Sequence, residues 1–235
     1  KGEALLQRHK DKVIYLGENQ SKKEVLFEYN YVLLYSESGE EEKLLAHINK
    51  LKGMKKRRPF NQREQYMLAV GLNHVADFYL NFEDSWEDDY PFVQAERYLQ
   101  ESFDALDAEK YPANFAQFAF NRNKAFRKSG KFEKAMQGND YLISIADSND
   151  YRMPFFIVQR GLIYAASGQK AEAIAAFRSV AELIHTGAEP LSQDYSNFQP
   201  STTVNHADLF AGVMDDFIKM YPDDREVKAL AAELY

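Results

Sequence analysis

The residues of this chain that could do acid–base or metal chemistry are its five histidines and its many carboxylates. The histidines are His9, His47, His74, His185 and His206. No two of them have the i, i+4 spacing that lets histidines on one helix face hold a zinc ion. The sequence contains neither a nucleophile elbow nor a phosphate-binding loop, and no carboxylate pair stands out among those that surface helices normally carry. We therefore expect no enzyme activity, with no catalytic residue, no metal site and no cofactor.

An acidic segment at residues 83–90 is the place where a cation would be attracted most strongly. Its carboxylates are Glu83, Asp84, Glu87, Asp88 and Asp89. The segment lacks the glycine turn and the final glutamate of an EF-hand loop, so a solvated insertion is the main interpretation and a calcium site the alternative. Trp86, in the same segment, either folds over an exposed helix end or anchors a partner. Residues 186–202, which contain Pro190 and Pro200, are expected to be irregular.

A basic run, Lys55–Arg58, precedes Pro59. Two interpretations are open: a solvated loop between helices, or a contact with an acidic partner or a phosphate. The chain as a whole has a formal net charge of −7. Proteins that bind nucleic acids need positive surface to displace counterions from phosphates, so we expect no nucleic-acid partner.

The composition leaves the compartment open. The absence of cysteine excludes disulfides and thiolate metal sites, and it is compatible with the bacterial periplasm and with the cytoplasm. No apolar run approaches the roughly 20 residues that a membrane helix needs, so we expect no direct membrane insertion. The chain begins with Lys1 and shows no signal-peptide pattern. That start is typical of a mature or excised segment of a longer protein, with room for a tether or an effector domain outside it.

Helices must position any site, because apolar residues recur at three- and four-residue spacing and no alternation typical of strands is sustained. The predicted helices span about residues 2–17, 22–37, 40–53, 61–82, 91–107, 112–129, 131–147, 152–167, 170–185, 203–220 and 224–235. Three starts carry a cap residue three positions before an acid: Ser21 with Glu24, Asn61 with Glu64, and Asp223 with Glu226. Gly39, Gly130 and Gly168 are expected to end helices in the left-handed conformation that glycine adopts readily.

The clearest repeating unit spans residues 154–185. Its characteristic positions are Gly161, Tyr164, Gly168, Ala173 and Phe177. Two antiparallel helices cross closely only where small residues meet, which is the role expected for Gly161 and Ala173. Tyr164 and Phe177 would fill the space on either side of that crossing. This spacing resembles the tetratricopeptide repeat, and the resemblance implies an all-α, right-handed superhelix of antiparallel helix pairs.

Weaker units keep the same register at residues 22–53, 61–107 and 112–147, and residues 201–235 resemble a degenerate closing pair. The matching positions are Tyr35 and Gly39 in the first of these, Ala76, Tyr79 and Ala95 in the second, and Phe126, Gly130 and Ala135 in the third. Asn123 and Asn139 depart from the small or apolar residues expected in the third unit. The prediction is one domain over residues 1–235 with about four to five units. A bundle of non-repeating helices is the alternative.

In such a superhelix the first helix of each pair lines the inner, concave groove. The register assigns these residues to it: Tyr29, Asn30, Asn73, Asp77, Phe120, Asn121, Lys124 and Arg127. The asparagine side chains could donate to and accept from a peptide backbone, or simply be tolerated on a polar helix face. Lys124 and Arg127 come nearest to a site for a carboxylate. The family's fuller carboxylate clamp of Lys, Asn and Arg is incomplete here.

The resemblance implies a non-catalytic scaffold that binds a protein or peptide in its concave groove. A competing hypothesis is a sensory or regulatory segment of a larger signalling protein. Such a segment would bind a peptide or small ligand and pass a change in superhelix pitch to an effector domain. An attached DNA-binding, kinase or cyclase domain in the full-length sequence would favour this second hypothesis.

Overall fold

Glycine ends three of the helices, as the sequence predicts. In the computed structural model Gly39, Gly130 and Gly168 have φ angles of 78°, 72° and 81°. A side chain at such a φ is strained, so glycine lets the chain leave one helix and enter the next within a few residues. The structure describes residues 2–3, 20–81, 90–146, 152–186 and 206–234. The predicted helix at 2–17 therefore lies almost wholly outside the described residues.

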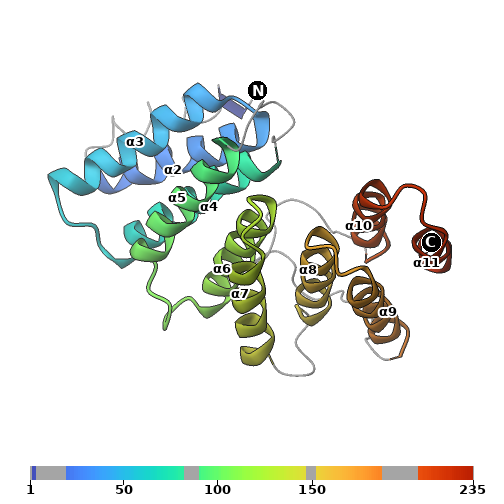
Figure 1. The fold of residues 1–235 in the computed structure, drawn as a ribbon. Coiled ribbons are helices and arrows are strands. Elements are labelled where there is room, and N and C mark those ends of the chain that lie inside the picture. Colours follow the sequence, from blue (N-terminus) through green and yellow to red (C-terminus); the bar gives the residue numbers. More distant parts are fainter. Residues whose placement is uncertain (1, 4–19, 82–89, 147–151, 187–205, 235) are drawn as a thin grey trace. The chain divides into compact units, whose positions relative to one another are not determined.

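The described residues form ten helices and no strand, which confirms the all-α prediction (Figure 1). The helices are α2 (Gln20–Ser38), α3 (Glu41–Arg57), α4 (Gln62–Asn81), α5 (Tyr90–Ala105), α6 (Pro112–Lys128), α7 (Phe132–Ile145), α8 (Met153–Ala166), α9 (Lys170–Thr186), α10 (His206–Met220) and α11 (Arg225–Leu234). Among these helices, none is long and apolar enough to cross a membrane.

The helices fall into two compact units, residues 1–125 and 126–235. In the first unit α2 packs on α3, α4 packs on α5, and α2 also contacts α4. In the second unit α8 packs on α9, α8 also contacts α10, and α9 also contacts α11. Each unit thus combines contacts between consecutive helices with contacts between alternate helices.

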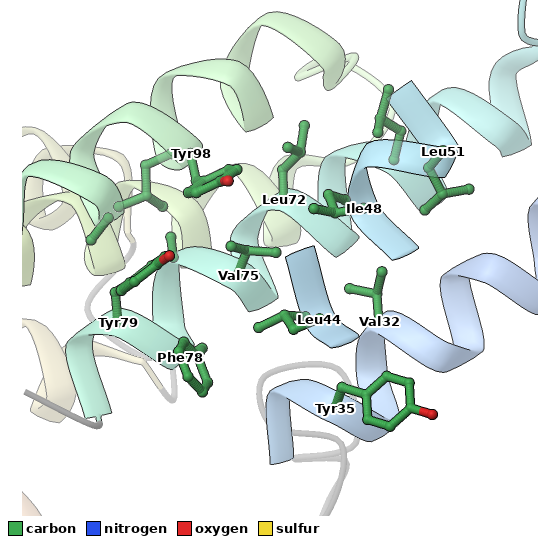
Figure 2. Close-up of a cluster of buried hydrophobic side chains, with 14 of the residues drawn as sticks. Val32, Tyr35, Leu44, Ile48, Leu51, Leu72, Val75, Phe78, Tyr79 and Tyr98 are labelled. Atoms are coloured by element: carbon green, nitrogen blue, oxygen red, sulfur yellow. The ribbon is translucent and has the colours of Figure 1, made fainter. Parts of the chain in front are cut away.

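The core of the first unit is formed by the apolar faces of α2 to α5 (Figure 2). Its buried side chains include Val32, Tyr35, Leu44, Ile48, Leu51, Leu72, Val75, Phe78, Tyr79 and Tyr98. Tyr79 is fully buried, and its hydroxyl donates a hydrogen bond to Glu41 Oε1 at 2.6 Å. Burial of one large apolar side chain contributes roughly 1.5–3 kcal/mol, so tertiary packing holds these helices in place. The predicted structural positions Ala76 and Ala95 are also fully buried in this core.

Gly161 on α8 lies directly against the Phe177 ring of α9. A Cβ atom added at Gly161 would lie 2.5 Å from Phe177 Cε1, closer than real Cβ contacts. Phe177 is fully buried, and its ring centroid lies 5.0 Å from that of Phe217 on α10. Ala173 is fully buried as well, and Tyr164 packs against the same cluster. The structure thus places the Phe177 ring directly over Gly161, whereas the repeat pattern predicted that Ala173 would meet the glycine and that Phe177 would lie beside the crossing.

The capping box predicted at the start of α4 is confirmed. Asn61 Oδ1 accepts a hydrogen bond from the Glu64 backbone N–H at 3.0 Å, and Glu64 Oε2 accepts one from the Asn61 N–H at 2.9 Å. Each side chain satisfies a free N–H group of the first turn. The Glu64 carboxylate is nearly inaccessible to solvent, at 4% exposure.

The other two predicted caps are wrong. Ser21 lies inside α2, which already includes Gln20. At α11 the cap is Asp224 rather than Asp223, because Asp224 Oδ1 accepts hydrogen bonds from the N–H groups of Glu226 and Val227. The helix starts at Arg225, and a cap residue must directly precede the first turn.

Candidate functional site

The predicted groove residues lie on α2, α4 and α6, the helices that the register treats as the first members of their pairs, and all of them except Arg127 belong to the first unit. Tyr29 and Asn30 are partly buried on α2, Asp77 is partly buried on α4, and Phe120 and Lys124 are partly buried on α6. These five side chains therefore keep some access to solvent. Asn73, Asn121 and Arg127 are buried, at 3%, 8% and 7% exposure.

Asn73 and Asn121 are paired with each other. Asn121 Nδ2 donates a hydrogen bond to Asn73 Oδ1 at 3.1 Å, which joins α6 to α4. A buried amide needs a hydrogen-bonding partner, and here each amide serves the other. Both sequence interpretations of these asparagines required solvent access, either for a bound peptide or for water. The structure instead assigns this pair to the contact between two helices.

The polar side chains that remain accessible form what we call the first-helix face: Glu37 on α2, His74, Asp77 and Asn81 on α4, and Lys124 on α6. Lys124 Nζ donates a hydrogen bond to Asn81 Oδ1 at 2.8 Å, a second link between α4 and α6. Burial lowers the pKa of His74, and the charges of Asp77 and Glu37 partly oppose that shift. His74 is therefore neutral at pH 7, with one ring nitrogen to donate and one to accept a hydrogen bond.

Three members of this face were missed in the sequence: Glu37, His74 and Asn81. Asn81 and Glu37 lie one or more helical turns beyond the predicted groove residues of their helices, and His74 directly follows Asn73. The repeat register contained a signal for them, because residues three and four positions apart share a helix face. Tyr29 lies on α2, as Glu37 does. Burial and, to a smaller extent, the nearby Tyr66 raise the pKa of Tyr29 to about 12.

The basic run is not the solvated loop predicted as one interpretation. Lys55, Lys56 and Arg57 form the last turn of α3, where cations are stabilised by the helix dipole. Arg58 follows the helix end and binds the Glu64 carboxylate with two hydrogen bonds, Nη1 to Oε2 at 2.9 Å and Nη2 to Oε1 at 2.6 Å. Arg58 thereby supports the capping box of α4.

A pocket of about 390 Å³ lies beside this basic turn, between α3 and α5 over α4. We call it the α3–α5 pocket. It is lined by Lys52, Lys55, Lys56, Leu68, Leu72, Glu101, Asp104 and Ala105. Lys52 Nζ lies 2.5 Å from Glu101 Oε2, so a salt bridge joins the two helices that flank the pocket.

A buried carboxylate–imidazole pair links α2 to α3. Glu28 is 3% exposed, and its Oε2 lies 2.5 Å from His47 Nδ1 and 3.6 Å from Lys50 Nζ. The His47 ring stacks on Tyr31 and Tyr35, with centroid distances of 4.6 and 5.3 Å. This arrangement fixes the imidazole between helices. Within the described ranges, no group of three or more His, Asp or Glu side chains could hold a metal ion.

Comparisons with protein-family models, with curated proteins and with solved structures found no match for this chain. Function is therefore inferred from the geometry of the chain's own residues. Trp86, with the acidic residues Glu83 to Asp89, lies outside the described residues. The same is true of nearly all of the segment predicted to be irregular at 186–202.

Proposed function

We propose that this chain is a tetratricopeptide-like scaffold without catalytic activity, which binds a protein or peptide through the first-helix face. In this proposal the helix pairs α2/α3, α4/α5, α6/α7 and α8/α9 are successive units of a right-handed superhelix with about four to five units, and α10/α11 is a degenerate closing pair. The contacts of α2 with α4 and of α8 with α10 support stacking, because alternate helices meet when helical hairpins stack side by side.

The observation that carries the binding proposal is the continuity of polar side chains across α2, α4 and α6. Asn81 and Lys124 are already hydrogen-bonded across two helices, and His74 lies within the electrostatic reach of Asp77 and Glu37. Positive and negative side chains, with several hydrogen-bond donors and acceptors, are thus held on α2, α4 and α6. Such a surface can pair with the N–H and C=O groups of an extended peptide without demanding one sequence.

The proposal is tested by site-specific crosslinking. A photo-reactive amino acid replaces Asp77 in one variant and Asn49, an exposed residue of α3, in a matched control. Each variant is irradiated with the same random dodecapeptide library, and crosslinked peptides are quantified by mass spectrometry. We expect enrichment at position 77 over position 49. Equal crosslinking at the two positions would contradict the assignment.

A second variant tests the same face by charge. Lys124→Gln should reduce peptide crosslinking at position 77 and leave stability nearly unchanged, because Lys124 is only partly buried. Asn121→Ala is unsuitable for this purpose, since it would leave the buried amide of Asn73 without its partner and cost about 1–3 kcal/mol of stability.

A further inference from the structure

The α3–α5 pocket has an apolar floor and a charged rim. Leu68 and Leu72 of α4 belong to the buried core, at 3% and 2% exposure, so the floor is the edge of that core. Ala105, the last residue of α5, adds a small side chain that leaves the space open. Pockets that bind ligands typically combine an apolar lining with a few polar groups that fix orientation.

The rim carries three lysines and two carboxylates, so its net charge is positive. Lys52 is paired with Glu101, and Asp104 Oδ1 accepts a hydrogen bond from Gln100 Nε2 at 2.9 Å. Lys55 and Lys56 make no ion pair with any residue that the structure describes. The dipole of α3 favours lysines at this helix end, but it does not account for the apolar pocket beside them. The two ammonium groups are therefore available to an anion at the mouth of the pocket.

We propose that the α3–α5 pocket binds an acidic peptide segment through one bulky apolar side chain and the carboxylates that flank it. The apolar side chain would lie on Leu68, Leu72 and Ala105, and the flanking carboxylates would pair with Lys55 and Lys56. A volume of about 390 Å³ is enough for a large side chain, and the pocket is open, so the peptide backbone stays outside. This site uses α3 and α5, whereas the first-helix face uses α2, α4 and α6, and it stands whether or not that face binds a peptide.

The test is fluorescence anisotropy with the full chain and a labelled nonapeptide that has a central Phe flanked by two Glu on each side. One comparison peptide replaces every Glu with Gln, and another replaces the Phe with Ser. We expect the parent peptide to bind, both comparison peptides to bind more weakly, and added salt to weaken the parent peptide. No binding of the parent peptide, or equal binding of all three, overturns the proposal.

Protein variants locate the binding site. Lys55→Gln with Lys56→Gln should weaken the parent peptide roughly tenfold, since two exposed ion pairs are lost. Lys219→Gln with Lys228→Gln removes the same charge from exposed positions of α10 and α11 and should leave the affinity unchanged. Equal losses in the two double variants would mean that net charge alone attracts the peptide, and the pocket assignment would fail.

Two further arms separate this site from its competitors. Ala105→Leu fills the pocket without changing its charge and should weaken peptide binding. An unchanged thermal midpoint would show that this variant is folded. An unchanged affinity overturns the apolar half of the proposal. Sodium phosphate should displace the peptide no better than sodium chloride at equal ionic strength. Selective displacement by phosphate would identify a simple anion site in place of a peptide site. Crosslinking of the peptide library at position 77 should be unchanged by Lys55→Gln with Lys56→Gln, which keeps the two proposals distinguishable.

Discussion

The substitution Gly161→Ala tests whether the close approach of α8 and α9 depends on the missing side chain. The new Cβ would lie 2.5, 2.8 and 2.9 Å from three atoms of the Phe177 ring. That ring cannot move freely, because it is fully buried and contacts Phe217. Alanine favours a helix over glycine by about 1 kcal/mol, whereas overpacking of a core costs about 1–3 kcal/mol. We therefore expect a net loss of up to about 2 kcal/mol in the free energy of unfolding.

A matched glycine shows the opposite balance. Gly53 lies inside α3, and a Cβ added there meets no atom within 4 Å. Gly53→Ala should gain helix stability without overpacking, by about 0.5–1 kcal/mol. The two substitutions are chemically identical, so their difference in sign isolates the packing at Gly161.

Urea unfolding followed by far-UV circular dichroism measures both changes, and hydrogen exchange of α8 and α9 locates the first. The Phe177→Leu background adds a double-mutant cycle, because a smaller side chain makes room for the new Cβ. Gly161→Ala should cost less in that background than in the parent. If Gly161→Ala stabilises the protein as much as Gly53→Ala does, the proposed dependence on the glycine is refuted.

Two more predictions concern buried and capping polar groups. Asn139 is fully buried on α7, and neither its amide oxygen nor its amide nitrogen has a hydrogen-bonding partner among the residues that the structure describes. Asn139→Leu should therefore raise the free energy of unfolding, measured in urea, by about 1–3 kcal/mol; a loss would mean that the amide has a partner. The Lys170 ammonium, at 2.7 Å, and the Val227 and Glu226 N–H groups lower the pKa of Asp224 below its ordinary value of 3.8. A lowered pKa stabilises the fold above that value, so stability should fall as pH drops below about 3.8. Asp224→Asn keeps a cap but removes the charge and should flatten this dependence in acid unfolding curves, whereas Asp223→Asn should not.

Local signals in the sequence were sufficient for the helical architecture. The 3.6-residue periodicity predicted nearly every described helix, and the turn glycines were predicted because an αL residue is needed where two helices meet. The Asn61–Glu64 box was likewise readable, since both partners lie within one helical turn. The helices, the turn glycines and the capping box each depend on residues that are close together in the sequence.

The end of α3 shows where a local signal misleads. The helix predicted at residues 40–53 stops at Gly53, yet α3 continues to Arg57. Glycine marks a helix end only where the backbone needs a positive φ, and Gly53 is not among the glycines with positive φ. The lysine-rich turn that follows is compatible with a helix C-terminus. This longer helix is what brings Lys55 and Lys56 beside Leu68 and Leu72.

The candidate sites themselves could not be predicted from local patterns. Asn73 and Asn121 are 48 residues apart, and Lys124 and Asn81 are 43 apart. Their pairing depends on how α6 packs against α4, which is decided by the apolar contacts of several helices together. The structure shows contacts of α2 with α4 and hydrogen bonds between α4 and α6, but the repeat register could not tell which polar side chains would be buried between these helices.

The helix α4 connects the two proposed binding surfaces of the first unit. Leu68 and Leu72 form the floor of the α3–α5 pocket, while Asp77 and Asn81, farther along α4, belong to the first-helix face. Most of α4 is buried, so a substitution there would disturb both surfaces and the core at once. Lys55 and Lys56 on α3 and Lys124 on α6 are instead partly or fully exposed on the flanking helices. Charge-removing substitutions at these lysines therefore separate the two proposed surfaces, because none of them changes a buried side chain of α4. Lys124→Gln costs α4 one hydrogen bond, from Lys124 to the exposed Asn81.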